Sequence, residues 1–503
     1  YVFSGGIAPV LDPNNNPIFN AAGNQVTESI SSLERYRRTL FFKGSGYNNA
    51  QIRALGGGAS QFFIEGGEPT AKINQLDYSF YIQNSLSVRK DMSLSFGVRY
   101  ENQTNIKSPF NFAPRLGIVW SPGINQKKKT PLTTLPRISA GIGIFYQRVN
   151  EQFVFNEERY NKRLQYLVDD PNILDLYPNQ PSVNQLEQFA LPRTIFTLDP
   201  KVQPPQQILA SLTIEKTLPF KINSGVIIGY YKVNHALRSR NINAPIVGTY
   251  NLNDLSRAIY PLGRDRGNIY QTESSGTVKA KVVTAFLKIQ KFKFTEFSIN
   301  YSYRDSKDNL VSGSGSFDPY NFSSEFAVSD NNIKNNFFII NRSRLPFGIG
   351  LDNILSIGSG PPFNITLGRD SNGDKLFLER PAFATDLNNP GLISTPYGLL
   401  DPNPSPTDQI IPRNLGRGSA FVGLDTILKK NFRFSKDSSG NSKYSLNISL
   451  FANNILNLNN KAAPIGNLAS PNFLRAVTYS TNSVGFFGST GPRKFRLSIN
   501  FGF

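Results

Sequence analysis

Cysteine is absent from this chain of 503 residues, and methionine, tryptophan and histidine occur once each. Without cysteine the chain forms no disulfide framework, no thiolate metal site and no cysteine nucleophile. The single histidine, His235, excludes a histidine-rich metal site, and no serine or aspartate stands at a spacing that suggests a catalytic triad. We therefore expect a protein that is not an enzyme.

Long hydrophobic runs are absent as well. No stretch approaches about 18 consecutive apolar residues, so we expect no transmembrane helix. The sequence begins at Tyr1 without a signal-peptide pattern, and we expect it to be part of a longer protein. Hydrophobic residues nevertheless make up 39% of the chain and aromatic residues 12%, which excludes a disordered protein.

The pattern that is present throughout the chain is a two-residue alternation. In 92–101 every second residue is apolar, from Met92 to Tyr100, and serine, glycine, arginine and glutamate stand between them. The segments 138–146 and 494–503 repeat the pattern. Alternation of this kind predicts β-strands with one apolar and one polar face.

The length of these segments distinguishes two kinds of β-protein. Strands of a soluble sandwich usually have about 5–6 residues, whereas a strand that crosses a bilayer needs about 9–11 tilted residues. The segments here last roughly 10–13 residues, and their polar faces carry arginine, lysine, glutamate and glutamine, which suit a watery lumen. We favour a transmembrane antiparallel β-barrel over a soluble β-protein.

The alternation predicts thirteen strands with short turns on one side and long loops on the other. The predicted strands are 76–88, 91–102, 112–121, 137–147, 206–217, 221–233, 278–290, 295–305, 334–345, 348–358, 420–432, 443–455 and 492–503. The long connections are 148–205, 234–277, 306–333, 359–419 and 456–491. Short periplasmic turns and long extracellular loops are typical of bacterial outer-membrane barrels.

The number of strands bears on the domain organisation. Barrels formed by one bacterial chain have an even number of strands, so thirteen implies at least one further strand before residue 1. We expect 1–75 to be the top of a truncated strand followed by an extracellular loop, and 76–503 to be the transmembrane barrel region. Strands 76–88 and 492–503 should then pair with β-structure outside this chain rather than with each other.

Several short motifs, in a fixed order, resemble those of a known family. They are 61–74 (QFFIEGGEPTAKIN), 94–101 (LSFGVRYE), 111–116 (NFAPRL), 141–146 (GIGIFY), 360–374 (GPPFNITLGRDSNGD), 379–382 (ERPA), 412–418 (PRNLGRG) and the closing 493–503. From about residue 60 to the end, the chain resembles the C-terminal region of TonB-dependent outer-membrane receptors. It is most similar to the Oar-like group, which has a carboxypeptidase-regulatory-like N-terminal domain.

The resemblance implies a 22-stranded barrel in the bacterial outer membrane, of which this chain supplies the last strands. It also implies an N-terminal plug, energised uptake of a bulky ligand (a siderophore, glycan or peptide) and coupling to the TonB complex. The plug, the TonB box and the remaining strands are not in this sequence. The terminal Phe503 resembles the signal read by the outer-membrane assembly machinery.

The turn at 370–374 places oxygen-bearing side chains at alternate positions, namely Asp370, Asn372 and Asp374. Hard cations such as Ca²⁺ take several carboxylate and amide oxygens around one turn. The turn departs from an EF-hand, because Lys375 holds the glycine position and Pro381 holds that of the closing glutamate. The other interpretation, which we favour, is an Asx-rich turn without metal. We therefore expect no cofactor, and Ca²⁺ in this turn is the only candidate.

Five basic residues are expected on the polar face of the strands. They are Arg99, Arg115, Arg137, Lys494 and Arg496. Together they could attract an anionic ligand into the lumen. The alternative, which we favour, is that they pair with carboxylates of the plug or of neighbouring strands.

A net charge of +19 makes nucleic acid a partner to consider. Basic residues are scattered along the chain, and the only compact run is Lys127 to Lys129. We therefore expect no nucleic-acid partner, and outer-membrane lipid and lipopolysaccharide as the partners of exposed basic residues.

Two hypotheses from different classes follow. The first is a TonB-dependent transporter of which this chain is the barrel portion. The second is a structural or adhesive surface barrel that anchors partners and transports nothing. An open diffusion pore is a third, which conductance would reveal.

Overall fold

Thirteen long strands form one antiparallel sheet in the computed structural model, in which each strand pairs with its neighbour in sequence. The structure describes residues 1–67, 70–122, 135–189, 194–251, 254–290, 292–310, 319–322, 325–374, 376–387, 389–405, 408–436, 442–478 and 491–503. The strands are β4 (Asp77–Arg89), β5 (Met92–Gln103), β6 (Phe112–Trp120), β7 (Arg137–Tyr146), β10 (Gln206–Leu218), β11 (Ile222–Asn241), β12 (Ile269–Ile289), β13 (Thr295–Asp308), β15 (Asn335–Leu345), β16 (Ile349–Gly358), β22 (Phe421–Lys436), β23 (Ser442–Asn453) and β24 (Lys494–Gly502). The thirteen predicted strands are thereby confirmed.

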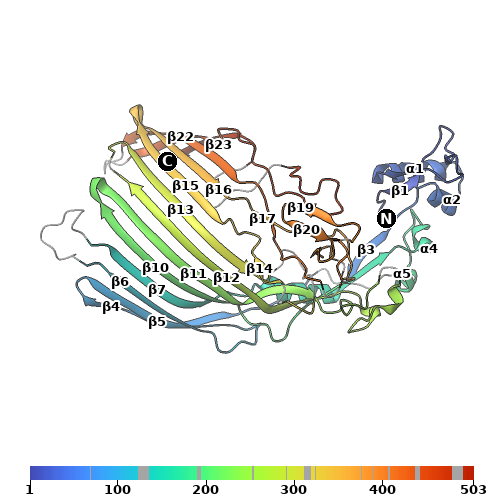
Figure 1. Ribbon diagram of the computed structural model, residues 1–503, viewed down its shortest axis with the longest axis horizontal. Helices are drawn as coiled ribbons and strands as arrows, with labels where there is room; N and C mark the ends of the chain where they lie inside the picture. Colours follow the sequence, from blue (N-terminus) through green and yellow to red (C-terminus); the bar gives the residue numbers. More distant parts are fainter. Residues whose placement is uncertain are drawn as a thin grey trace.

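The sheet curves into a trough with β4 and β5 along one rim and β22 and β23 along the other (Figure 1). Its two edge strands are β4 and β24, and within the described residues they do not pair with each other. The expectation that they would not close the sheet together is met. The sheet is open rather than a completed barrel.

The register gives the sheet one mainly polar and one mainly apolar face, because directly opposed residues in an antiparallel pair share a face. On β4 and β5 the pairs Ser85–Ser95 and Gln83–Gly97 lie on one face, and Leu86–Leu94 lies on the other. We call these the polar face and the apolar face. The same assignment follows from strand to strand across the whole sheet.

Short turns join the strands at one end of the trough. Two of them contain a phenylalanine at positive φ: Phe220 at 64° and Phe347 at 59°, each directly after a proline. The prolines fix the first turn residue, and the chain reverses within three residues. Most of the predicted turn 122–136, including the lysines at 127–129, lies outside the described residues, as does 437–441.

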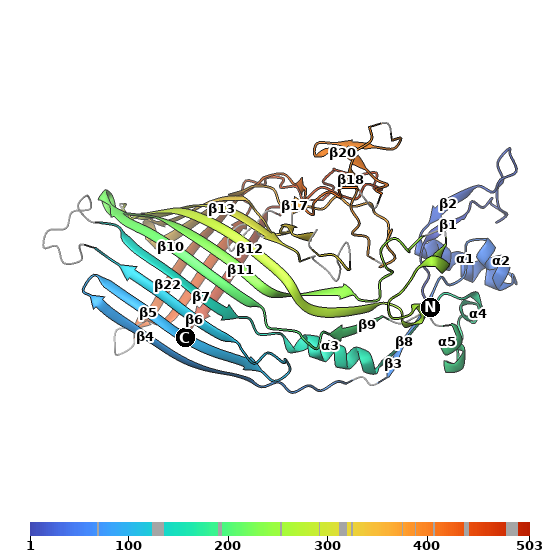
Figure 2. The ribbon, with the colours of Figure 1, turned by 60° about the horizontal axis from the view of Figure 1, so that its bottom comes forward.

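The N-terminal residues and the longer connections form two compact regions at the other end of the trough. The first is an N-terminal module of β1 (Gly6–Pro9), β2 (Thr27–Ile30), α1 (Ser32–Gly44), α2 (Asn49–Ala54) and β3 (Phe62–Gly67). From the β7–β10 connection come α3 (Glu151–Lys162), β8 (Arg163–Val168), α4 (Pro171–Leu174), α5 (Val183–Phe189) and β9 (Ile195–Leu198). Strand β3 pairs with β8, and α4 and α5 pack near them, beyond the ends of the trough strands (Figure 2).

The N-terminal module and the β7–β10 connection share a hydrophobic core. Phe62, Val168, Ile173 and Leu186 are buried there, and Tyr1 packs against them. Val2, which we expected at the top of a strand, forms an isolated bridge with residue 61 instead of joining the large sheet. None of the described helices is both long and apolar enough to cross a membrane.

The second compact region, which we call the loop layer, contacts the loop-side ends of β12 and β13. It contains β14 (Ala327–Val328), β17 (Pro362–Phe363), β18 (Ala382–Phe383), β19 (Ile393–Thr395), β20 (Gly398–Asp401) and β21 (Gly416–Arg417). Its core includes Phe363, Ile365, Leu400 and Ile411, of which the last three have no exposed surface. Most of this layer is the β16–β22 connection.

Strands β11 and β12 reach further than their alternation predicted. After a bulge around His235, whose φ is 58°, they pair again from Arg238–Glu273 to Asn241–Tyr270. The expected loop 234–277 therefore shortens to the segment between Asn241 and Ile269. The bulge interrupts the alternation, which is why the sequence pattern ends there.

Candidate functional site

The polar face brings the five predicted basic residues onto one surface. Arg115 lies opposite Gly97 on β5 and Gly143 on β7, and Arg137 lies opposite Glu215 on β10. Near the other rim, Arg496 lies opposite Phe451. The complete set on this face is Arg99, Arg115, Arg137, Lys494 and Arg496.

These residues differ in what they contact. Arg99 forms an ion pair with Glu101 at 2.6 Å, and Arg137 forms one with Glu215 at 2.8 Å. Lys494 has no ion pair within the described part of the chain. Two of the five are thus neutralised by the sheet itself, and an anion-attracting role for the set stays a prediction.

The other two arginines lie over aromatic rings. The guanidinium carbon of Arg115 is 4.4 Å from the ring centre of Phe145, and that of Arg496 is 4.4 Å from that of Phe451. Contact of this kind holds a guanidinium against an aromatic ring of the wall, on the polar face. Gly143 makes room for one stack, since a Cβ there would lie 3.0 Å from Phe145 and 3.2 Å from Arg115.

Glycines line the polar face beside Arg115. A shallow pocket of about 410 Å³ is bordered there by Gly97, Gly117, Gly141 and Gly143. A Cβ at Gly117 would lie 2.8 Å from Ser95 Oγ, and one at Gly97 would lie 2.7 Å from a backbone oxygen. The backbone contact requires glycine at Gly97, whereas at Gly117 a rotation of the Ser95 side chain would relieve the contact.

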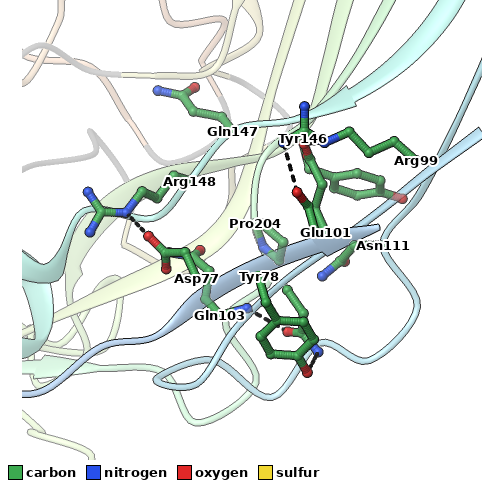
Figure 3. Close-up of a pocket in the computed structure, with 12 residues that line it drawn as sticks. Asp77, Tyr78, Arg99, Glu101, Gln103, Asn111, Tyr146, Gln147, Arg148 and Pro204 are labelled. Atoms are coloured by element: carbon green, nitrogen blue, oxygen red, sulfur yellow. Dashed lines mark hydrogen bonds and ion pairs between the residues drawn. The ribbon is translucent and has the colours of Figure 1, made fainter. Parts of the chain in front are cut away.

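A second pocket of about 320 Å³ lies where β4 to β7 end on the loop side (Figure 3). Arg148 bridges Asp77 at 2.5 Å and Glu151 at 2.8 Å, which ties the start of the β7–β10 connection to β4. Gln103 adds two hydrogen bonds with the backbone of Val149, one donated and one accepted. Carboxylates, guanidinium groups and tyrosines border the pocket together, so a ligand there would meet both charges and aromatic surface.

Buried ion pairs hold the loop layer together. Arg380 donates to Glu325 at 2.8 Å, and the two side chains are 4% and 1% exposed. Arg413 pairs with Asp308 and with Asp330. On the adjoining ends of β11 and β12, Arg238 and Arg240 both pair with Glu273. A buried charge without its partner is costly, so each pair fixes the segments that supply it.

The motifs 379–382 and 412–418 contain three of the residues that join the loop layer. Besides Arg380 and Arg413, Asn414 donates to the backbone oxygen of Val328 at 2.7 Å and to Asp330 at 2.6 Å. The sequence pointed to these motifs only through the resemblance. Their structural role is to connect the β16–β22 loop to the β13–β15 loop.

The predicted Ca²⁺ turn places Asp370 and Asp374 close together and adds a third carboxylate, Glu379. The carboxylate oxygens of the three lie within 4.8 Å of one another. Asn372 accepts a hydrogen bond from the Asp374 backbone at 3.0 Å and donates to its side chain at 3.2 Å. Sequence reasoning missed Glu379, because it looked for the closing glutamate at Pro381.

Burial dominates the electrostatics of these carboxylates. Burial, with a smaller contribution from the neighbouring carboxylates, raises the pKa of Asp374 to about 6 and that of Glu379 to about 7. Burial and the charge of Asp370 also raise the pKa of Tyr250, which packs against the turn. The surroundings therefore disfavour the charged form of Asp374 and Glu379.

At the end of β24, Phe503 is 95% exposed, and its ring lies 6.4 Å from that of Phe501. The side chain is free for recognition by another protein. Its role as an assembly signal stays a prediction.

Residues 102–495 match the family model described as "Outer membrane beta barrel domain". The chain belongs to this family. It is accordingly a protein of the bacterial outer membrane, and its polar face is the wall of a lumen whereas its apolar face meets lipid. The predicted fold class and location are thereby confirmed.

A solved structure shows the same fold at low sequence identity. The outer membrane transporter YddB from Escherichia coli is 12% identical, with a TM-score of 0.53, and the match covers 99% of this barrel chain and 48% of YddB. A mutant of the ferric enterobactin receptor PfeA from Pseudomonas aeruginosa is also 12% identical, with a TM-score of 0.46 and coverage of 84% and 44%.

The FrpB iron transporter from Neisseria meningitidis is 10% identical, with a TM-score of 0.42 and coverage of 84% and 45%. The chain thus spans about half the length of these structures. No protein of curated function matches it in sequence.

Proposed function

We propose that this chain is part of the wall of a TonB-dependent outer-membrane transporter of the Oar-like group. The transporter would take up a bulky ligand such as a siderophore, glycan or peptide. The missing parts would be further strands, a plug inside the barrel and a segment that contacts TonB. The substrate class rests on the resemblance of the motifs quoted above.

The observation that carries the proposal is the open thirteen-strand sheet with polar residues on its inner face. An open sheet edge in lipid leaves backbone groups unpaired, each at a cost of several kcal/mol, so further strands must complete the wall. A wall of more than thirteen strands encloses a wide lumen, and barrels of about 22 strands hold a plug there. The YddB fold, of which this chain covers 48%, supports a wall of that size.

The polar face supplies features that suit a plugged lumen. Arg137 and Arg99 already have glutamate partners, whereas the arginines over Phe145 and Phe451 keep their charge toward the interior. These stacked arginines and Lys494 could pair with carboxylates of a plug or of an anionic ligand. The same residues on a barrel that merely anchors partners would need no such counterpart.

Binding to TonB separates transport from the alternative of a structural or adhesive barrel. The full-length protein, solubilised from outer membranes, is passed over an immobilised periplasmic domain of TonB. We expect specific retention, which is lost when the segment before the barrel is deleted. Absence of retention contradicts the proposal and favours anchoring.

Conductance separates a plugged transporter from an open pore. The same full-length protein is inserted into planar lipid bilayers. A plugged barrel is expected to show no steady conductance. Large, steady conductance steps contradict the proposal and favour diffusion through an unplugged lumen.

A further inference from the structure

Three carboxylates converge in the loop layer, on the connection between β16 and β22. Asp370, Asp374 and Glu379 place their carboxylate oxygens within 4.8 Å of one another. The residues are 9%, 1% and 3% exposed, respectively. Like charges this close and this poorly hydrated repel one another strongly unless something positive lies between them.

Glu379 shows that the cluster is not satisfied by the protein. One of its oxygens, Oε1, accepts a hydrogen bond from the backbone of Ser371 at 3.0 Å. The other, Oε2, is fully buried and has no hydrogen-bond partner within the described residues. A buried carboxylate oxygen without a partner, next to two further carboxylates, indicates a ligand that the protein does not itself provide.

The arginines that flank the cluster in sequence are engaged elsewhere. Arg380 donates to both carboxylate oxygens of Glu325, at 2.8 and 3.3 Å. Arg369 donates to the backbone oxygen of Pro402 at 2.7 Å and to Asn403 at 2.8 Å. Burial and the neighbouring carboxylates raise the pKa of Glu379, and no cation among the described residues lowers it.

We propose that Asp370, Asp374 and Glu379 bind a Ca²⁺ ion that fastens the loop layer. Ca²⁺ binds oxygen ligands at about 2.3–2.6 Å, so two ligands on opposite sides of the ion lie about 5 Å apart, which matches the spacing of these oxygens. Backbone oxygens of the 370–374 turn and water complete the coordination. The site does not depend on whether the barrel transports a ligand.

The ion would order a turn on which a distant part of the chain packs. Tyr270, at the far end of β12, donates a hydrogen bond to the backbone oxygen of Asp374 at 3.3 Å. Tyr250 packs so closely on the turn that a Cβ at Gly373 would lie 2.4 Å from its ring. Ca²⁺ binding therefore holds the turn against the β11–β12 connection.

The two tyrosines also provide a direct measurement, because Tb³⁺ occupies Ca²⁺ sites and emits when a nearby tyrosine transfers excitation energy to it. The full-length protein in detergent is freed of metal with EDTA and titrated with Tb³⁺. We expect saturable emission that Ca²⁺ displaces. In Glu379→Gln and Asp374→Asn the affinity for Tb³⁺ and Ca²⁺ should fall at least tenfold.

A matched control lies in the N-terminal module, where Asp12, Asn14 and Asn16 have the same alternate spacing. There Asp12 accepts backbone hydrogen bonds from Asn14 and Asn16 on the surface, and within the described residues it belongs to no group of three carboxylates. Asp12→Asn should leave the Tb³⁺ titration unchanged. If Asp12→Asn weakens binding as much as Glu379→Gln does, the proposal is wrong.

The unsubstituted protein gives an independent test in case a variant does not fold. Amide hydrogen exchange is measured with Ca²⁺ and with EDTA. Slower exchange of the peptide covering 368–381 in Ca²⁺, with no change around residues 12–16, supports the site. Equal exchange in both conditions, or no saturable Tb³⁺ emission, overturns it.

Discussion

The wall of the trough and the loop layer are built from similar residues but bury them differently. On the apolar face of the wall, Phe96, Ile142 and Leu497 are 41%, 53% and 61% exposed. In the loop layer, Ile365 and Leu400 have no exposed surface. The wall leaves its apolar side chains to lipid, whereas the loop layer packs them against one another as a water-soluble domain does.

The ion pairs of the wall and of the loop layer also differ in burial. The wall pair of Arg137 and Glu215 is 53% and 37% exposed, whereas the loop pair of Arg380 and Glu325 is 4% and 1% exposed. An exposed ion pair contributes little to stability because water screens it. In a buried pair, the loss of one partner leaves the other charge buried and unpaired, which is costly. The comparison indicates that the loop layer is held by specific contacts and the wall by its backbone ladder and the membrane.

The largest effect is expected from removing a buried charge in the loop layer. Arg380→Ala leaves Glu325 buried without its partner, which should cost about 3–5 kcal/mol of loop-layer stability. Amide exchange of 359–420 in the detergent-solubilised protein should accelerate, while the strands β4 to β7 remain protected. Replacing both residues by methionine should restore most of the protection, and failure to do so would show that the pair is not what fixes the layer.

The wall should be sensitive to the face that a charge occupies. Val226 and Ile227 are neighbours on β11, with exposures of 39% and 37%, on the apolar and polar faces respectively. Val226→Arg should lower the free energy of unfolding from lipid vesicles by about 2–4 kcal/mol, since it places a guanidinium in lipid near the middle of the strand. Ile227→Arg should cost far less, and equal costs would contradict the assignment of the faces.

The N-terminal module should respond to acid. Glu34 on α1 accepts from Arg37 at 2.7 Å and from Arg38 at 2.9 Å, and these two arginines, Arg37 most, lower the pKa of Glu34 to about 2 from its ordinary 4.5. Because the folded pKa is depressed, the stabilisation is present above about pH 4.5 and is lost as the pH falls toward 2. Exchange of the α1 amides should rise over this window.

Glu34→Gln is the control for that acid response. The variant should lose the stabilisation at neutral pH and show a smaller change between pH 4.5 and 2. Salt should weaken the effect in the unsubstituted protein, since the Glu34 side chain is 30% exposed. An unchanged response in Glu34→Gln would assign the acid sensitivity to other carboxylates.

The smallest effect is expected for an exposed ion pair of the wall. Arg137→Ala removes the partner of Glu215 and should change the free energy of unfolding by less than about 1 kcal/mol. Unfolding in guanidinium from vesicles measures the difference. A loss as large as that of Arg380→Ala would remove the distinction between wall and loop layer.

The wall was predictable from sequence because its signal is local. Alternation such as that from Met92 to Tyr100 identifies a strand and its faces without knowledge of any distant residue. The same rule assigned Arg115 and Arg496 to one surface, although they lie on strands near opposite rims. The bulge at His235 broke the alternation, and the pairing beyond it was missed.

The loop layer was not predictable because its contacts join distant segments. Arg413 donates to Asp308, 105 residues earlier in the chain, and no periodicity connects the two. The turn at Asp370 was recognised from its spacing, but Glu379 joins it through a fold of the backbone that spacing does not encode. The N-terminal module was missed for the same reason, since β3 pairs with β8 about a hundred residues later.

The glycines beside Arg115 have a mechanical consequence. Interlocking side chains resist sliding, whereas a strip of bare backbone offers nothing to interlock with. The strip formed by Gly97, Gly117, Gly141 and Gly143 runs across three neighbouring strands of the inner wall. The side chains of Gln83, Arg115 and Phe145 border the strip, so a body that slid along it would be held at its margin rather than on the strip itself.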